Sequence, residues 1–356
     1  MYKRQGPRPG RRERGAHPMK VAVLSFAHVH AAAYLTLLRD LPGVEVIGSD
    51  PDTALAAPGE TRGRAFAEGH GVRYAETYED AFAWGPDAVI VCSENARHRP
   101  LVELAAAHRV DVLCEKPLAT TVADGEAMVA ACRAAGVRLA VAFPVRFSPA
   151  YAAVKRAVAA GDTGRVLTVS GANNGHMPTR ARRWFADPEL AGGGALMDHT
   201  VHIADLLDDL FAAHAVEVYA QTNNLLYEGE VTAETSGLVT VVYDNDTVAT
   251  IDCSWSHPRS HPAWGGLEMT LVGEHATLEM DAFDQKVHGH SERHGRALEL
   301  PFGVDLDAAM LRAFLYGPGP DGMAVADGEG GLRTLRIVAA AYASARTGAP
   351  VAVAGT

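Results

Sequence analysis

Long hydrophobic runs are missing from this sequence, although 48% of its 356 residues are hydrophobic. No apolar run approaches the roughly 18 to 20 residues that a helix needs to span a bilayer, which excludes a membrane-spanning protein. Charged residues make up 21% of the chain. This composition is typical of a globular protein, and the length is too great for one compact core, so we expect two domains.

Cysteine is scarce as well. The chain has four cysteines, far apart and without a C-x-x-C pair: Cys92, Cys114, Cys132 and Cys253. Two of them lie in apolar, strand-like runs, so we expect buried free thiols rather than a disulfide framework. Because no apolar segment typical of a signal peptide is present either, the sequence favours a cytoplasmic protein.

Basic charge is concentrated at one end of the chain. Residues 1–18 carry six Lys or Arg and one Glu, about +5, so subtracting this from the formal −11 leaves −16 for the remainder. Glycine and proline prevent an amphipathic helix here, and we interpret residues 1–18 as a disordered basic tail or an extension upstream of a start at Met19. The acidic remainder argues against general affinity for nucleic acid, and we expect no nucleic-acid or membrane partner.

Short apolar runs alternate with alanine-rich helical stretches between residues 19 and 144. The runs are KVAVLSF, VEVIGSD, DAVIVCS, VDVLCEKP and RLAVAF. Strands that are apolar throughout are typical of a parallel sheet covered on both faces. The alternation predicts an α/β fold with a doubly wound parallel sheet, which we interpret as a dinucleotide-binding domain over residues 19–144.

The pattern changes over residues 145–356. Longer runs such as RVLTVSGANN and VEVYAQTNN alternate polar with apolar residues, which predicts an open, largely antiparallel sheet with one exposed face. We expect this second domain to bind substrate and to form a homodimer or homotetramer through its sheet. We also expect residues 284–296 to form a polar loop, and the last helix to pack back on the first domain.

The first strand leads into the turn LSFAHVHA, where a dinucleotide site usually has G-x-G-x-x-G. Ser25, Ala27 and His30 stand at the three glycine positions. We expect Ser25 to make the turn with a negative φ and Ala27 to add one methyl group at the tightest point. His30 is the largest intrusion, yet the N–H groups and dipole of the following helix remain available for a phosphate. We interpret this turn as a modified dinucleotide site, to which His28 or His30 could donate a hydrogen bond.

Asp50 ends the second strand, about 25 residues after Ser25. An acidic residue there accepts hydrogen bonds from the adenosine ribose hydroxyls and repels a 2′-phosphate, which favours NAD over NADP. The alternative is an ordinary turn residue before Pro51.

Three further motifs follow in order. They are Ser93–His98 (SENARH), Glu115-Lys116-Pro117, and GGGALMDHTVHIADLL over residues 192–207. Together with the first turn they resemble the glucose-fructose oxidoreductase, inositol dehydrogenase and MocA (Gfo/Idh/MocA) family, and the likeness extends over residues 19–353. The resemblance implies an amino-terminal Rossmann domain, a carboxy-terminal α/β domain with an open antiparallel sheet, and a homo-oligomer.

The resemblance also implies which residues act. Lys116, Asp198 and His202 would be catalytic: Lys116 can stabilise a developing alkoxide, His202 can accept a proton, and Asp198 can orient or charge-stabilise His202. The turn, Asp50 and the two short motifs would contact the cofactor, namely Ser25, Phe26, Ala27, His28, Val29, His30, Asp50, Ser93, Glu94, Asn95, His98, Glu115, Lys116 and Pro117. Substrate would meet His98, Lys116, Arg146, Arg183, Trp184, Asp198, His199 and His202. Glu94 departs from the family, which has proline there.

We therefore expect an NAD(H)-dependent oxidoreductase that transfers hydride to or from a hydroxyl or carbonyl carbon of a sugar, inositol or related polyol. One alternative is a non-redox binding or regulatory module that has lost the cofactor, as Ser25, Ala27, His30 and Glu94 would suggest. A weaker alternative is a metal-dependent hydrolase or lyase using Asp198, His199 and His202. Since the chain has neither H-E-x-x-H nor a cysteine pair, we expect no metal.

Overall fold

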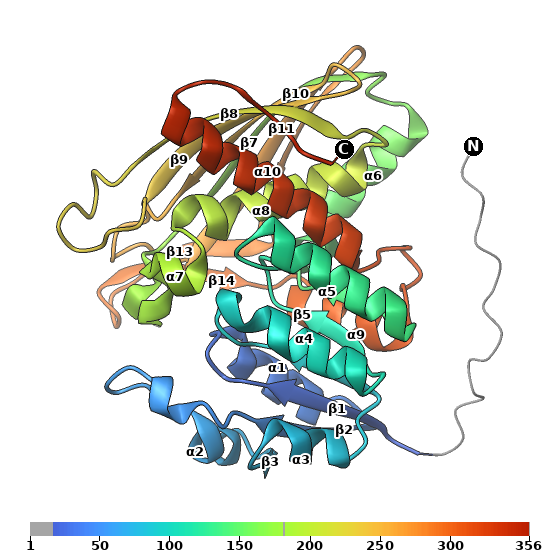
Figure 1. Cartoon of the computed structure of the whole chain (residues 1–356). Coiled ribbons are helices and arrows are strands. Elements are labelled where there is room, and N and C mark those ends of the chain that lie inside the picture. The colour runs from blue at the N-terminus through green and yellow to red at the C-terminus, as the bar shows by residue number, and fades with distance from the viewer. Residues whose placement is uncertain (1–16, 181, 356) are drawn as a thin grey trace.

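The computed structural model describes residues 17–180 and 182–355, which form two seven-stranded sheets with helices packed around them and one two-stranded hairpin (Figure 1). The first domain follows the predicted alternation of strand and helix. Its elements are β1 (Met19–Leu24), α1 (His30–Arg39), β2 (Val44–Ser49), α2 (Gly63–Gly69), β3 (Arg73–Ala75), α3 (Tyr78–Ala83), β4 (Ala88–Val91), α4 (His98–Ala107), β5 (Asp111–Cys114), α5 (Val122–Ala135) and β6 (Leu139–Val141).

The first sheet has the strand order β15-β6-β5-β4-β1-β2-β3, in which β1 to β6 pair in parallel. Its central strands are buried on both faces: every residue of Val21–Leu24 and Val89–Val91 is fully inaccessible to solvent. The predicted doubly wound parallel sheet is therefore confirmed. In such a sheet the carboxyl ends of the strands form the ligand crevice where the strand order reverses, here between β1 and β4.

The second domain is built on a seven-stranded, mostly antiparallel sheet with the order β12-β11-β7-β10-β9-β8-β16, in which β7 and β10 alone pair in parallel. Its elements are α6 (Pro149–Ala160), β7 (Val166–Gly175), α7 (Pro188–Ala191), α8 (Ala195–Leu210), β8 (Ala215–Asn223), β9 (Ser236–Tyr243), β10 (Val248–Ser254), β11 (Gly265–Gly273), β12 (Thr277–Asp281), β13 (Lys286–Ser291), β14 (Arg296–Pro301), α9 (Leu306–Tyr316), β15 (Ala326–Asp327), α10 (Gly328–Thr347) and β16 (Val351–Ala352).

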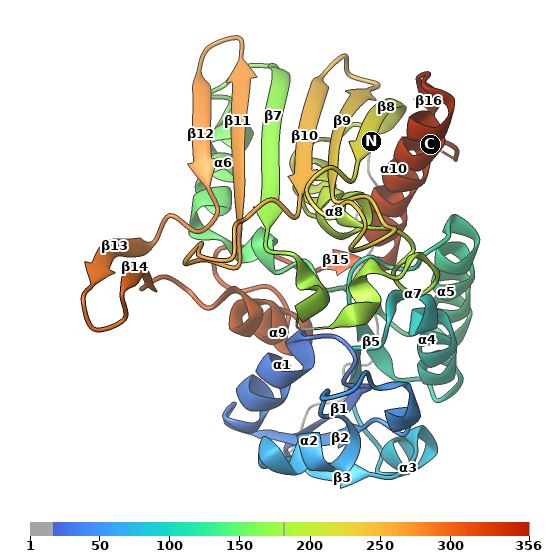
Figure 2. The ribbon, with the colours of Figure 1, turned by 90° about the vertical axis from the view of Figure 1, so that its left-hand side faces the viewer.

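Helices α6, α8 and α10 pack on one face of this sheet, while the face turned to the viewer in Figure 2 carries no helix. Side chains alternate accordingly, and in β9 the buried Val239 and Val241 alternate with outward-facing residues. Leu167, Tyr219, Leu238 and Val272 lie on the strands of this sheet with exposed side chains.

The last part of the chain returns to the first domain. Strand β15 pairs antiparallel with β6, and α10 follows it across α5 and α8. The contact is close, because a methyl group added at Gly331 would lie 2.5 Å from a methyl carbon of Val141.

The expectation that residues 284–296 form a polar loop was wrong. Strands β13 and β14 form a two-stranded hairpin there, with Lys286 opposite Pro301 and Ser291 opposite Arg296. Its residues are polar because most of them are exposed in the hairpin, so the composition did not distinguish a strand from a loop.

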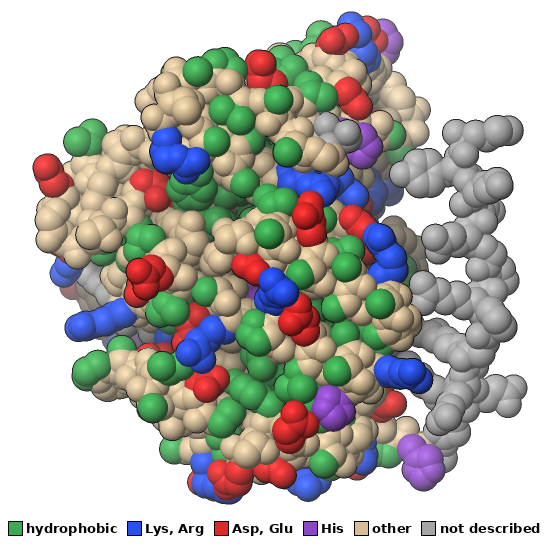
Figure 3. Space-filling view, viewed as in Figure 1, with side chains coloured by type: hydrophobic (Ala, Val, Ile, Leu, Met, Phe, Trp, Pro, Cys, Tyr) green, Lys and Arg blue, Asp and Glu red, His purple; other side chains and the backbone are tan. Residues whose placement is uncertain are grey.

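The four cysteines are free and buried, as predicted. Among the residues that the structure describes, no helix combines the length and the apolar character needed to cross a membrane. Acidic and basic side chains are interspersed with hydrophobic ones on the face shown in Figure 3.

The three glycines before α8 allow the helix to start against the second sheet. Gly194 donates its N–H to Glu234 Oε1 at 2.8 Å, and Ala195 donates its N–H to the Glu234 carbonyl at 2.9 Å. A Cβ on Gly194 would lie 2.0 Å from that carbonyl oxygen, which leaves no room for a side chain. Close backbone approach thus fixes the position of α8.

Replacing Gly194 by Ala should lower the free energy of unfolding by about 1–3 kcal/mol, the usual cost of forcing an extra methyl group into a packed site. Urea denaturation would measure it. Gly69→Ala is the matched control, because no heavy atom lies within 4 Å of its added methyl group. Equal unfolding midpoints for the two variants would contradict the proposed close contact.

Candidate active site

A cavity of about 430 Å³ lies between the carboxyl ends of strands β1 and β5 and helix α8 of the second domain. Its polar lining comes from the turn between β1 and α1, the end of β5, β7, α8 and the start of α9, and includes His28, His30, Lys116, Asn173, Asn174, Asp198, His199, His202, Asp305 and Asp307. The fold thus brings together all three predicted catalytic residues.

Lys116 and Asp198 form a buried ion pair across the domain boundary. Lys116 follows β5, with a cis peptide bond to Pro117, and its Nζ lies 2.5 Å from Asp198 Oδ1. The second oxygen, Oδ2, accepts a hydrogen bond from Trp255 Nε1 at 3.0 Å. Burial alone would raise the pKa of Asp198, but Lys116 and His199 outweigh it and hold the pKa well below its usual value. The carboxylate is therefore ionised and keeps the ammonium group at the cavity.

The contacts of the two α8 histidines differ from the expected ones. His199 Nε2 lies 3.2 Å from Asp198 Oδ2, and His199 Nδ1 lies 2.6 Å from the Asn173 carbonyl. Asp198 is thus bound by Lys116, Trp255 and His199, which corrects the expectation that it orients His202 directly. The prediction that Asp198 and His202 lie on the same helix was correct. The Asp198 carboxylate, however, is bound by side chains from other elements and not by His202.

His202 lies edge-on to Phe143, with the ring centroids 5.9 Å apart. Its Nδ1 is buried and has no hydrogen-bond partner among the described residues. Burial, and then the charge of Lys116, lower the pKa of His202 well below its ordinary value. His202 is therefore a neutral imidazole that can accept a proton.

The turn after β1 is buried rather than open. Ser25 has φ +65°, a left-handed conformation that costs a non-glycine residue roughly 1–2 kcal/mol. This corrects the expected negative φ: the serine adopts the geometry of the glycine that it replaces. The Ala27 carbonyl accepts hydrogen bonds from Trp184 Nε1 at 3.0 Å and Arg182 Nε at 2.9 Å, so the second domain covers the turn.

His28 and His30 both face Glu115, which is fully buried at the end of β5. The Nδ1 atoms lie 3.6 Å and 2.9 Å, respectively, from Glu115 Oε1. Burial lowers the pKa of His28 to about 3, whereas for His30 the nearby Glu115 outweighs burial and raises the pKa. Burial would raise the pKa of Glu115, but the two histidines lower it. These groups contact one another, and both histidines also line the cavity, so a hydrogen bond from either of them to a phosphate stays a prediction.

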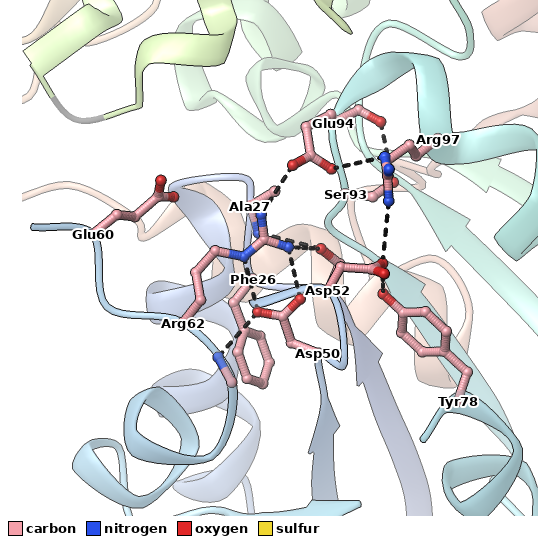
Figure 4. Close-up of polar contacts among 12 residues, drawn as sticks. Phe26, Ala27, Asp50, Asp52, Glu60, Arg62, Tyr78, Ser93, Glu94 and Arg97 are labelled. Carbon is pink, nitrogen blue, oxygen red and sulfur yellow. Dashed lines mark hydrogen bonds and ion pairs between the residues drawn. The ribbon is translucent and has the colours of Figure 1, made fainter. Parts of the chain in front are cut away.

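Asp50 lies at the end of β2, as predicted, but its carboxylate is already bound. Arg62, at the start of α2, makes two hydrogen bonds to it, with Nη2 to Oδ1 at 2.7 Å and Nε to Oδ2 at 3.0 Å. Arg62 also donates to Glu94 Oε1 at 2.9 Å and to Ser25 Oγ at 3.0 Å. Figure 4 shows the guanidinium between the two carboxylates. All four side chains are buried.

Sequence reasoning missed Arg62 and Trp255. Arg62 lies in GETRGRAF, which has the composition of an exposed loop, and nothing in its spacing relates it to Asp50 or Glu94. Trp255 follows the predicted strand TVATIDCS, where a large aromatic residue indicates a core position and not a hydrogen bond to a catalytic carboxylate.

Several expected ligand contacts go instead to the protein itself. Asn95 Nδ2 donates to the Ala191 carbonyl at 2.8 Å, and the buried His98 Nδ1 lies 3.0 Å from the Pro117 carbonyl. Ser93 Oγ donates to the Glu94 carbonyl at 3.1 Å. None of these three lines the cavity beside Lys116, but Asn95 Oδ1 and His98 Nε2 are buried without a partner among the described residues, so their contact with cofactor or substrate stays a prediction.

The expected contact of Arg146 with substrate also differs from what the structure has. Its guanidinium binds both oxygens of Asp205 at 2.7 Å and Asp209 at 3.2 Å, and the buried pair joins the segment before α6 to α8. Arg183 is exposed on a separate outer cleft, and Trp184 is buried against the turn after β1. Arg146 was predicted from its match to the family pattern, and Arg183 and Trp184 from their chemical type; neither signal reveals the partners that a side chain finds in the fold.

Asp198, His199 and His202, the ligands of the weaker metal-dependent alternative, are not among the residues whose ligand atoms gather closely enough for one ion in the described part of the chain. Among residues 17–180 and 182–355, the group of three His, Cys, Asp or Glu whose ligand atoms lie within 4.8 Å of one another is His28, His30 and Glu115. Asp198 instead holds an ammonium group, as described above.

The nicotinamide and adenosine ends of a bound NAD molecule would have different surroundings at the carboxyl edge of the first sheet. The nicotinamide end would lie beside the start of α1: the helix begins at His30, its N-cap residue Val29 makes no side-chain cap hydrogen bond, and Val29 lines the same cavity as Lys116 and His202. The adenosine end meets Arg62, because Asp50 is fully buried and its oxygens are bound by Arg62 and the Gly63 N–H. A ribose can reach Asp50 only after the Arg62 side chain moves.

Comparisons with known proteins agree with this arrangement. Residues 25–143 match the family model described as "Oxidoreductase family, NAD-binding Rossmann fold", and residues 151–279 match "GFO/IDH/MocA C-terminal domain". D-apiose dehydrogenase of Paraburkholderia graminis is 28% identical over 348 residues, covering 91% of this chain and 85% of that protein. D-xylose 1-dehydrogenase [NADP(+)] of Haloarcula marismortui is 27% identical and covers 78% of each chain.

Solved structures share the fold. GenD2 from gentamicin A biosynthesis, in complex with NAD, superimposes with a TM-score of 0.81 at 22% identity, covering 96% of this chain and 98% of that one. The myo-inositol 2-dehydrogenase from Lactobacillus plantarum gives a TM-score of 0.76 at 17% identity, with coverage of 94% and 99%.

Replacing Arg62 by Ala should lower the free energy of unfolding by about 3–5 kcal/mol, because Asp50 and Glu94 would be left as buried charges without their partner. Chemical denaturation measures the change. Arg39→Ala is the control: Arg39 pairs with Asp40 on the surface, and its loss should leave the unfolding midpoint nearly unchanged. An Arg62 variant as stable as the Arg39 variant would contradict a buried, interdependent network.

Proposed function

Because the chain belongs to the Gfo/Idh/MocA oxidoreductase family and its first domain is an NAD-binding Rossmann fold, we propose that it oxidises or reduces a sugar, inositol or related polyol with NAD(H). The observation that carries the proposal is the Lys116–Asp198 ion pair beside His202 in one cavity at the carboxyl edge of the sheet. The cofactor supplies the hydride acceptor or donor.

The residues of this chain provide the acid–base chemistry. His202 accepts the proton of the substrate hydroxyl on Nε2, because its Nδ1 is buried. The ammonium group of Lys116 stabilises the oxygen as negative charge develops. Asp198 binds Lys116 and fixes the position of Nζ, and its negative charge also favours the protonated form of His202 without a direct hydrogen bond. Trp255 and His199 hold the carboxylate in turn.

The cavity lining supports a hydroxylated substrate. Asn173, Asn174 and His199 offer polar groups, and Trp264 supplies an aromatic surface at the same opening. A few polar groups that fix orientation, set among apolar walls, are typical of small-molecule sites. The relatives D-apiose dehydrogenase and D-xylose 1-dehydrogenase are named for sugars, which is consistent with this substrate class.

The first turn of α1, Asp50 and Lys116 would hold the cofactor. Asp50 favours NAD, since it can accept hydrogen bonds from both ribose hydroxyls. Arg62 neutralises part of that charge, which weakens the repulsion of a 2′-phosphate; NADP is therefore the less favoured cofactor and not an excluded one.

A second function, a non-redox binding module, is favoured by one observation: Arg62 takes the carboxylate that the ribose would use. The two functions differ in turnover. Oxidation of a polyol panel, followed by NADH absorbance, supports the oxidoreductase; binding of a sugar to the Lys116 cavity without turnover supports the module.

We further propose a cytoplasmic homodimer or homotetramer, assembled through the helix-free face of the second sheet. The exposed apolar side chains on that face, such as Leu238 and Tyr219, and the four free thiols support these two proposals.

Replacing His202 by Ala should reduce kcat by about 10²–10⁴-fold, the usual size of a general-base contribution. Steady-state rates with NAD and the best polyol measure the change. His288→Ala is the control, because His288 is exposed on the β13–β14 hairpin and pairs only with Glu299 among the described acidic residues. A loss smaller than about tenfold would remove His202 from the base role.

The pH profile tests the same residue independently. A general base must be neutral, and the lowered pKa of His202 keeps it neutral as the pH falls below its ordinary value of 6.5. We therefore expect kcat/KM to stay level from about pH 7.5 to pH 6 and to fall only in more acidic solution. A decline centred near pH 6.5–7 would show an unshifted base and contradict this environment.

A further inference from the structure

One side-chain cluster at the cavity is not used by the oxidoreductase chemistry. His28 and His30 come from the turn that opens α1, and Glu115 comes from the end of β5, 85 residues later in the chain. We propose that these three side chains bind one divalent transition-metal ion, of the zinc or cobalt class, at the base of the cavity.

The spacing of the ligand atoms matches a metal site. With ligand bonds of about 2.0–2.2 Å, two ligands of one ion lie roughly 3.0 to 3.5 Å apart. The Glu115 Oε1 atom lies 2.9 Å from His30 Nδ1 and 3.6 Å from His28 Nδ1, and all three ligand atoms lie within 4.8 Å of one another. Small side-chain movements therefore suffice to bring them around one ion.

The bonding in the cluster is incomplete without a cation. His28 is buried, its Nδ1 accepts a long hydrogen bond of 3.2 Å from the His30 N–H, and its Nε2 has no partner among the described residues. Its lone pair thus lies near the lone pairs of the ionised Glu115 Oε1. A cation between these acceptor atoms would convert an unfavourable contact into two coordination bonds.

The surrounding charge also favours a cation. Asp198, Asp305 and Asp307 line the same cavity as the cluster, together with one cation, Lys116. Lys116 is already paired with Asp198, so the ion-pair contacts of Glu115 among the described residues are those with His28 and His30, the other two proposed ligands. Buried charges are stable when they are paired or coordinate a metal.

Neighbouring groups hold the three ligands in place. Glu115 Oε2 accepts the Lys116 N–H at 3.2 Å, and the Tyr34 hydroxyl lies 3.4 Å from His30 Nδ1. The His28 ring packs edge-on against Phe185, with the centroids 5.3 Å apart. Such outer contacts orient metal ligands and tune their affinity.

Two imidazoles and one carboxylate form a ligand set that leaves further coordination positions open. Both His28 and His30 line the 430 Å³ cavity, so the open positions face the space where substrate hydroxyls would lie. The metal would then bind substrate oxygens beside Lys116. The inference rests on the cluster and not on the proposed redox function.

The test is a titration of tag-free protein, first treated with chelator and dialysed, with CoCl2 in the absence of nucleotide. We expect one equivalent of Co²⁺ to bind with the visible absorption of an imidazole-ligated ion. Glu115→Gln and His30→Ala should weaken binding by at least about 100-fold, since each removes a ligand. Circular dichroism establishes that each variant is folded.

His257→Ala is the matched control. His176, His257 and His261 form a second histidine cluster, with ring centroids 3.9 to 6.2 Å apart, in which His176 packs against Trp264 of the cavity lining. Retained Co²⁺ binding in this variant supports the proposed site. Loss of binding in His257→Ala but not in Glu115→Gln would overturn it, as would the absence of saturable binding by the unmodified protein at millimolar Co²⁺.

The two proposals fail separately. Absence of a Co²⁺ site would leave NADH binding and turnover untouched, and absence of NADH binding would leave the metal titration unchanged, because no nucleotide is present in it.

Discussion

The structure depends above all on charges that are buried in pairs at the edge of the first sheet. Lys116 belongs to the first domain and Asp198 to the second, so their ion pair is at once a link between the domains and the centre of the candidate active site. Neither charge would be tolerated at this depth alone. The rest of the cavity is arranged around that constraint, with Trp255 and His199 completing the contacts of the carboxylate.

The same principle explains the altered dinucleotide turn. The glycines are gone, but Ser25 keeps the left-handed backbone that the turn needs, and its hydroxyl accepts a hydrogen bond from Arg62. Arg62 in turn binds both Asp50 and Glu94, and a second cation, Arg97, lies 3.9 Å from the other oxygen of Glu94. Glu94, which replaces the proline of the family pattern, is therefore part of a compensated network, and the nucleotide must exchange one set of hydrogen bonds for another when it enters.

The sequence predicted those parts of the molecule that follow from the periodicity of apolar residues and from short motifs. Apolar runs such as Val21–Leu24 predicted a parallel sheet. The family motifs predicted that Lys116, Asp198 and His202 lie together. What it did not predict are pairings between side chains distant along the chain, because periodicity carries no information on them. Arg62 with Asp50, Arg146 with Asp205 and Trp255 with Asp198 are all of this kind. The hairpin at residues 286–301 was missed because its exposed strands lack an apolar face.

The central claim is that the carboxyl edge of the first sheet, between Arg62 and the Lys116 cavity, still binds a nicotinamide dinucleotide. Calorimetric titration of the cofactor-free protein with NADH, and then with NADPH, tests it most directly. The account predicts saturable binding of NADH with a dissociation constant in the micromolar range, and weaker binding of NADPH because of Asp50. No heat and no thermal shift at millimolar concentrations of either nucleotide would contradict it, and the Lys116 cavity would then belong to a module that has lost its cofactor.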